Sequence, residues 1–303
     1  MIVLQKMCVF FLLILAGFAA HRKKILDEES SRKISSLVVN IANPALILSS
    51  VTTEESGSIT RGDVLTAFLV ACITYAALIV AGRAIPYLVR APKEEKNMYD
   101  AMFVFSNIGF MGFPLMSALF GNESLLIGAA FVMVFNILIY TYGIWLMSPS
   151  GGEKKFQWKS LCNPGVIACL AAIFLFWNGI RIPGILGDAI GMLSNLTGPL
   201  SMIVIGVSLS VMNIKDIVGI PRLWVFCALK LLVFAVIGAL IMKRFVANEV
   251  IYGVGIIVLA DPVASMAAMF AQEYHCNEKL ASAGIALSTL LSVLTIPVVF
   301  WLV

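Results

Sequence analysis

The stretch from residue 107 to residue 114 reads Asn107-Ile108-Gly109-Phe110-Met111-Gly112-Phe113-Pro114, and it interrupts an otherwise apolar segment. A second interruption, which begins about half the chain later, reads Ala260-Asp261-Pro262-Val263-Ala264-Ser265. Proline removes a backbone donor and clashes with the carbonyl four residues earlier. In lipid, backbone groups freed in this way persist only where protein or a watery cavity satisfies them. Two interrupted spans at matching places in two halves of a chain indicate the binding site of a secondary transporter.

The composition predicts an all-α integral membrane protein. The 303 residues are 60% hydrophobic and 13% charged, whereas a soluble domain carries about 25% charged residues. A helix needs roughly 20 apolar residues to cross a bilayer. We expect ten such spans, centred near these residues: Leu12, Pro44, Val70, Gly109, Val134, Leu170, Ser201, Lys230, Leu259 and Leu291.

The Lys and Arg residues between the expected spans predict the orientation. They concentrate in the odd-numbered loops, beginning with Arg22, Lys23 and Lys24 in the first. Loops rich in Lys and Arg face the cytoplasm. We therefore expect a multi-pass protein of the cell membrane with both termini extracytoplasmic. The net charge of +4 follows from this bias and indicates no nucleic-acid partner.

The chain also indicates an internal repeat. Asn40-Ile41-Ala42-Asn43-Pro44 resembles Asn195-Leu196-Thr197-Gly198-Pro199 at nearly the spacing that separates the two interruptions. Five spans are an odd number, so a second half of five must be inserted upside down. We predict a first five-helix repeat over residues 1–147, a cytoplasmic linker over 148–160 and a second, inverted repeat over 161–303, with broken helices 4 and 9.

Five polar residues are expected at one depth in the membrane. At a rise of about 1.5 Å per residue, Asn43, Asn107, Asn136, Lys230 and Asp261 all come near the bilayer midplane. Together they predict one central cavity. Asn43 and Asn136 have an alternative reading, as a kink and as an interhelical hydrogen bond.

Five further positions complete this site, and Asp261 has two possible roles in it. Gly109 and Gly112 allow close approach of a ligand or of another helix, and we add Pro114, Pro262 and Ser265 as substrate-binding candidates. Asp261 is the ion-coupling candidate, because a charge at a bilayer centre costs about 3 kcal/mol. Its alternative role is structural, since a residue that directly precedes a proline can be the N-cap of the second half-helix. No His or Cys spacing indicates a metal or a cofactor.

At these residues the chain resembles the auxin efflux carrier family. The run Asn107 to Leu115 looks like that family's first crossover, and Pro262 to Tyr274 looks like its second crossover and exit. The resemblance implies a scaffold of helices 1, 2, 6 and 7 and a transport domain of helices 3–5 and 8–10. It implies an organic anion as substrate, and it is consistent with a homodimer. Asp261 stands where the plant pattern is apolar.

We therefore expect a secondary transporter of a small organic anion, a carboxylate that is auxin-like or a dicarboxylate, working by alternating access. Asp261 would couple transport to either H⁺ or Na⁺. One alternative is a cation-coupled symporter of a bile-acid-like solute. A second is a membrane receptor that senses its substrate without moving it. No catalytic constellation points to an enzyme.

Overall fold

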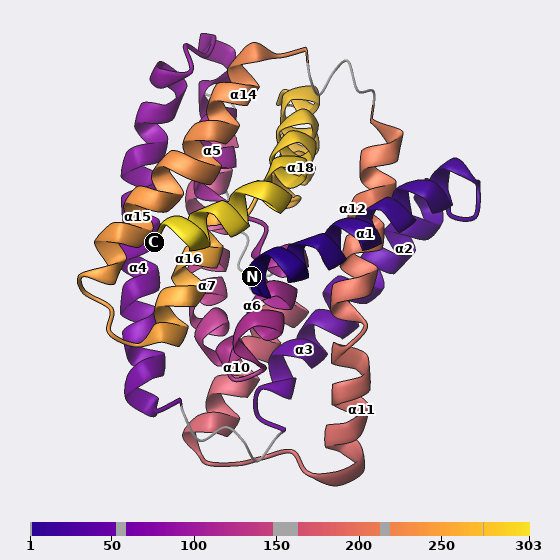
Figure 1. Cartoon of the computed structure of the whole chain (residues 1–303), viewed down its shortest axis with the longest axis vertical. Coiled ribbons are helices and arrows are strands. Elements are labelled where there is room, and N and C mark those ends of the chain that lie inside the picture. Colours follow the sequence, from indigo (N-terminus) through magenta and orange to yellow (C-terminus); the bar gives the residue numbers. More distant parts are fainter. Residues whose placement is uncertain (1, 53–58, 148–162, 213–218, 275) are drawn as a thin grey trace.

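The computed structural model describes residues 2–52, 59–147, 163–212, 219–274 and 276–303 (Figure 1). The predicted linker at 148–160 lies outside these ranges. Within them the chain is helical, and an isolated antiparallel bridge between Ser106 and Val263 is the β-type pairing found. The predicted all-α class is therefore confirmed for the described residues.

The apolar helices bear out a membrane protein. In the part of the chain that the structure describes, six helical stretches have the length and hydropathy to cross a bilayer: Ile2–Arg22, Arg61–Leu88, Ser124–Met147, Gly184–Val211, Pro221–Lys243 and Glu278–Leu302. Three apolar helices are shorter: Ile108–Phe120, Pro164–Trp177 and Glu249–Ala260. The arrangement of ten spans in two inverted repeats stays a prediction.

The elements of the first half are α1 (Ile2–Arg22), α2 (Glu28–Leu37), η1 (Val38–Ala42), α3 (Asn43–Ser49), α4 (Arg61–Leu88), η2 (Lys93–Glu95), α5 (Lys96–Val104), η3 (Ile108–Gly112), α6 (Phe113–Phe120), α7 (Ser124–Leu138), η4 (Ile139–Gly143) and α8 (Ile144–Met147). Those of the second half are α10 (Pro164–Trp177), α11 (Gly184–Ser194), α12 (Thr197–Val211), α14 (Pro221–Ala228), η5 (Leu229–Phe234), α15 (Ala235–Lys243), α16 (Glu249–Ala260), α17 (Met266–Glu273) and α18 (Glu278–Leu302).

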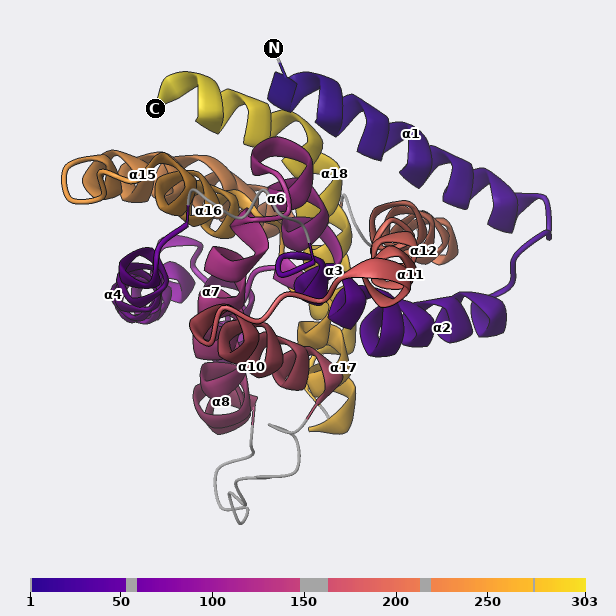
Figure 2. The ribbon, with the colours of Figure 1, turned by 90° about the horizontal axis from the view of Figure 1, so that it is seen from below.

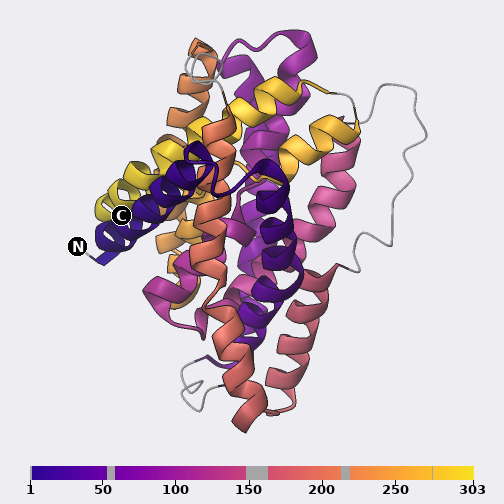
Figure 3. The same ribbon diagram turned by 90° about the vertical axis from the view of Figure 1, so that its right-hand side faces the viewer.

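The helices pack in two groups around the interruptions. In the first group α1 lies along α12, and α3 contacts α10 and α11. In the second group α4 packs on α5 and α7, and α16 packs on α15 and α18. Viewed from below, α1, α2, α11 and α12 occupy one side of the molecule and α4, α15 and α16 the other (Figure 2). The two termini lie near each other, where α1 contacts α18 (Figure 3).

Two glycines allow α1 and α12 to cross closely. A Cβ placed on Gly17 would lie 2.2 Å from the carbonyl oxygen of Ile203, and one on Gly206 would lie 2.1 Å from that of Ile14. Neither position can hold a larger residue without moving a backbone. Small residues at a helix crossing are typical of membrane proteins, where packing drives association.

Two of the prolines follow π-helical turns. The turn η1 comes directly before Asn43-Pro44, and η3 comes directly before Phe113-Pro114. The N–H groups of Asn43 and Phe113 reach five residues back, to the carbonyls of Val38 and Ile108. Each wider turn accommodates a proline that lacks its own N–H group. Pro114 therefore lies inside the second half-helix, and the helix is broken before it, at residues 105–107.

Candidate functional site

The two interruptions meet each other inside the protein. The first separates α5 from η3, and the second separates α16 from α17. The backbone N–H of Asn107 donates to the carbonyl of Pro262 at 2.9 Å, and the N–H of Ala264 donates to the carbonyl of Phe105 at 3.0 Å. The interrupted segments thus satisfy part of their freed backbone by pairing antiparallel, as buried irregular backbone must.

Asp261 is buried beside this pairing without a hydrogen-bond partner. Its exposed fraction is 0%, and neither carboxylate oxygen accepts a hydrogen bond from any residue that the structure describes. A Cβ on Gly112 would lie 2.6 Å from its Oδ2 atom, so the absent side chain of Gly112 makes room for the carboxylate. A buried polar group without a partner is costly. Asp261 is therefore the clearest candidate for a group that meets a ligand or an ion.

The alternative reading of Asp261 as an N-cap is wrong. Asp261 is the C-cap of α16, and its N–H donates to the carbonyl of Ile257 at 2.8 Å. The following helix, α17, begins at Met266 with Ser265 before it. The residues between the helices stay extended because they pair with the first interruption. Asp261 consequently lies at the negative end of the α16 dipole, which does not stabilise a carboxylate.

Lys230 reaches the same pairing from η5. The side chain is 2% exposed, and its Nζ atom donates to the carbonyl of Phe103 at 2.8 Å and to Ser106 Oγ at 3.0 Å. Its charge interacts with that of Asp261, although the two side chains do not form a direct ion pair among the described residues. The ammonium group therefore neutralises the C-terminal end of α5, as expected for a cation at that end of a helix.

Asn43, Asn107 and Gly109 also lie at or beside the interruptions. The Nδ2 atom of Asn107 and the Oδ1 atom of Asn43 are buried and have no hydrogen-bond partner within the described ranges. A Cβ on Gly109 would lie 3.7 Å from Asn43 Nδ2, so Asn43 faces η3. Ser265 is partly buried, and its side chain makes no capping hydrogen bond. An unpartnered amide donor here can bind a carboxylate oxygen.

Two predicted residues are placed differently. Pro114 is buried in α6, where its Cβ is 3.6 Å from the Cβ position of Gly198 on α12. Asn136 donates to the carbonyl of Val132 at 2.8 Å and accepts from Asn163 Nδ2 at 3.1 Å. The second bond joins α7 to the start of α10. This matches the alternative reading of Asn136 as an interhelical hydrogen bond.

Three residues outside the predicted set support these interactions. Ser106 accepts from Lys230, Ser288 Oγ accepts from the backbone N–H of Val263 at 3.0 Å, and Asn163 donates to Asn136. Ser106 directly precedes Asn107, which was a usable sequence signal. Ser288 on α18 joins the second interruption through a contact between residues 25 positions apart.

A second buried carboxylate lies on α5, the half-helix that precedes the first interruption. Asp100 on α5 is 3% exposed, and both of its oxygens accept from the Tyr142 hydroxyl, at 2.9 and 3.1 Å. Arg83 Nε lies 3.4 Å from Asp100 Oδ2, and the guanidinium also stacks over Trp145. The Asp100 carboxylate is therefore fully engaged and holds α4, α5 and η4 together.

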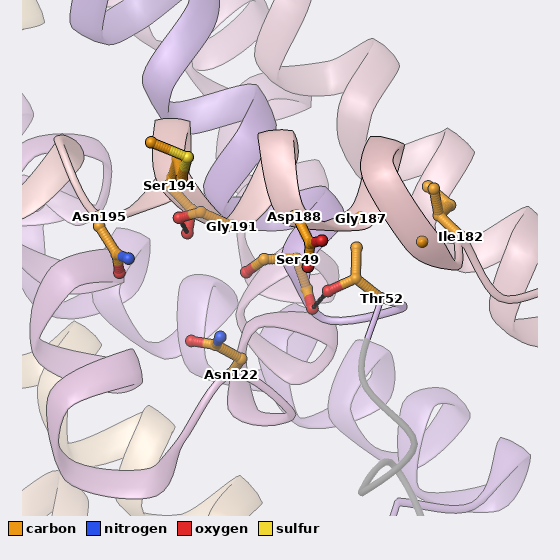
Figure 4. Close-up of a pocket in the computed structure, with 11 residues that line it drawn as sticks. Ser49, Thr52, Asn122, Ile182, Gly187, Asp188, Gly191, Ser194 and Asn195 are labelled. Atoms are coloured by element: carbon orange, nitrogen blue, oxygen red, sulfur yellow. Dashed lines mark hydrogen bonds between the residues drawn. The ribbon is translucent and has the colours of Figure 1, made fainter.

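A cavity of about 400 Å³ lies elsewhere, between the end of α3 and α11 (Figure 4). Its lining includes Ser49, Thr52, Asn122, Asp188 and Ser194, and none of the predicted site residues. Asp188 is the charged side chain among the lining residues, and it is exposed. A carboxylate lining does not favour an anion. Across the described residues, no cluster of three His, Cys, Asp or Glu side chains could hold a metal ion.

Comparison with known proteins places these features in a family. Residues 2–157 and 153–300 match the family model described as membrane transport protein. The chain is 28% identical to an uncharacterized transporter of Methanothermobacter thermautotrophicus, over 94% of this chain and 93% of that protein. It is 25% identical to a putative malonate transporter of Rhizobium meliloti, over 97% of this chain and 93% of the relative. The resemblance to a transporter family is confirmed.

Proposed function

This chain belongs to the membrane transport protein family, and from that premise we propose that it is a secondary carrier of a small organic anion. The observation that carries the proposal is the meeting of two interrupted helices around buried polar groups without partners. The name of the Rhizobium meliloti relative, a putative malonate transporter, favours a dicarboxylate over a bulky amphipathic acid.

The chemistry at the interruptions suits a carboxylate. The positive ends of the η3 and α17 dipoles attract an anion, although the N–H groups of Ile108 and Ala267 already donate to the carbonyls of Ser106 and Ala264. Asn107 Nδ2 adds an unpartnered donor. One carboxylate of the substrate would bind at Asn107 and Gly109, facing Asn43, and the second near Ser265.

Alternating access follows from the proposed repeat. Ten spans in two inverted halves would divide into a scaffold of spans 1, 2, 6 and 7 and a moving body of spans 3–5 and 8–10. The packing of α1 on α12 and of α3 on α10 and α11 supports the first body, and the packing of α16 on α15 and α18 supports the second. Both interruptions belong to the second body, so the anion would travel with it.

Asp261 is the proposed coupling residue. A fixed negative charge beside the anion site repels the substrate, and binding of a cation or a proton at Asp261 removes that repulsion. No described residue donates a hydrogen bond to either of its oxygens, which leaves them available for such a ligand. Transport is then coupled, because the bound cation raises the affinity of the carrier for the anion, and the bound anion raises its affinity for the cation.

The test is uptake of radiolabelled malonate into proteoliposomes. Wild type should accumulate malonate along an imposed pH or Na⁺ gradient. The Asp261→Asn variant should still exchange malonate but lose the dependence on either gradient. Asp188→Asn, which removes an exposed carboxylate on α11, is the matched control and should keep it. Malonate binding without flux in wild type would favour a sensing receptor. If the Asp261→Asn variant still follows the imposed gradient, Asp261 is not the coupling residue.

A further inference from the structure

Two oxygen atoms bind the Lys230 ammonium, and both are of types that also bind metal cations. The Nζ atom binds the carbonyl oxygen of Phe103, at the end of a half-helix, and the hydroxyl oxygen of Ser106, at the interruption. In secondary transporters, unwound carbonyls and half-helix C-terminal ends are the groups that coordinate coupling ions. Here an ammonium group from α14–η5–α15 binds them, and it is fixed in place by the chain.

The charges that face Lys230 support the same reading. Asp261 at the end of α16 is the carboxylate whose charge acts on Lys230, and its charge also acts on the Tyr75 hydroxyl of α4. The Cys227 thiol of α14 is the other titratable group beside Lys230. The Lys230 ammonium and the Asp261 carboxylate are both buried, without a direct ion pair between them among the described residues. A Na⁺ ion bound between the same oxygens and Asp261 would add a second positive charge beside the ammonium, which would repel it in a medium of low dielectric.

We propose that the Lys230 ammonium occupies the position of a coupling metal cation, so that this carrier works without Na⁺. This inference rests on the proposed function and narrows its coupling ion to H⁺, with Asp261 as the group that gains and loses the proton. Because Lys230 is part of the chain, its ammonium group neutralises the C-terminal end of α5 permanently. A Na⁺ ion at the same place would have to enter and leave with the substrate.

Removing the Lys230 ammonium tests the inference. Lys230→Ala leaves the Phe103 carbonyl and the Ser106 hydroxyl in place but removes the ammonium, so Na⁺ can enter. We expect its melting temperature to rise by about 3 °C or more when choline chloride is replaced with NaCl. Lys230→Met is the matched control, because it removes the charge but fills the space with a side chain of similar length. Its melting temperature, like that of wild type, should not respond to Na⁺.

A second arm measures transport. Wild-type malonate flux should be equal in NaCl and choline chloride. Lys230→Ala should lose at least about tenfold in choline chloride and recover part of that loss in NaCl, and adding Ser106→Ala should abolish the recovery. Na⁺-stimulated flux in wild type would overturn the inference. So would a Lys230→Ala protein that melts at the same temperature in both salts. If wild type carries no malonate, the proposed function fails, but the melting experiment still decides the cation position.

Discussion

Gly112 offers a sharp test of the contact between the two interruptions. It ends the π-helical turn η3, and a Cβ at this position would lie 2.6 Å from Asp261 Oδ2 and 3.3 Å from Ile108 Cγ2. Ordinary contacts between carbon and oxygen atoms are well above 3 Å. In Gly112→Ala, the carboxylate or the turn must therefore move by at least several tenths of an ångström, and the carboxylate is fully buried.

The size of the effect follows from the cost of overpacking. Inserting a methyl group into a packed interior costs about 1–3 kcal/mol. If this cost falls on the substrate-competent state, transport slows by about 5- to 150-fold, since each 1.36 kcal/mol changes a rate tenfold. The assay is initial malonate uptake in proteoliposomes, normalised to the amount of inserted protein.

Gly198→Ala is the control for this prediction. Its Cβ would lie 3.6 Å from Pro114 Cβ, an ordinary van der Waals contact, so uptake should stay within about twofold of wild type. If Gly112→Ala transports at the wild-type rate while folding normally, the carboxylate does not need the space beside η3. The account of Asp261 as part of the moving site would then be refuted.

Three further results are expected. Pro262→Ala restores a backbone donor and lets α16 continue, so malonate uptake should fall at least about tenfold. The control Pro297→Ala, within the unbroken helix α18, should take up malonate at the wild-type rate. Equal uptake by the two variants would refute the second interruption as part of the site. Asn136→Ala should lower the free energy of unfolding by about 0.6 kcal/mol, the average for a hydrogen bond between membrane helices, and leave malonate uptake within about twofold of wild type. A complete loss of malonate binding would instead show that Asn136 contacts the substrate. In a Cys-free background, Lys23→Cys should resist an impermeant thiol reagent in intact cells and Asn178→Cys should react; the reverse pattern would invert the topology.

The interruptions were predictable from the sequence because their causes are local. Proline, glycine and asparagine act on the backbone within a few residues, so the breaks near residues 107 and 261 could be located. Their boundaries could not, since residues 261–264 are held extended by pairing with residues 105–107. That pairing joins segments half the chain apart. It is also why Asp261 ends one helix and does not begin the next.

The partners of the polar residues were less predictable. Lys230 and Asp261 stood out because charges are expensive in a membrane. The acceptors of Lys230 lie 124 and 127 residues away, and sequence spacing carries no information about such contacts. Asn136 shows the opposite case. Its expected depth suited the central cavity, but its side chain bonds to Asn163 at the start of α10. Depth along a helix does not determine the direction in which a side chain points.

The most direct measurement of the central claim is substrate protection at the interruption. Ser265→Cys in a Cys-free background places a thiol directly before α17, and the variant is first shown to retain uptake. Malonate should slow its reaction with a small maleimide at concentrations that also saturate transport, and malonamide, which has the same shape without the charges, should not. Labelling that is unaffected by malonate in a transporting protein would contradict an anion site at the meeting of the two interrupted helices.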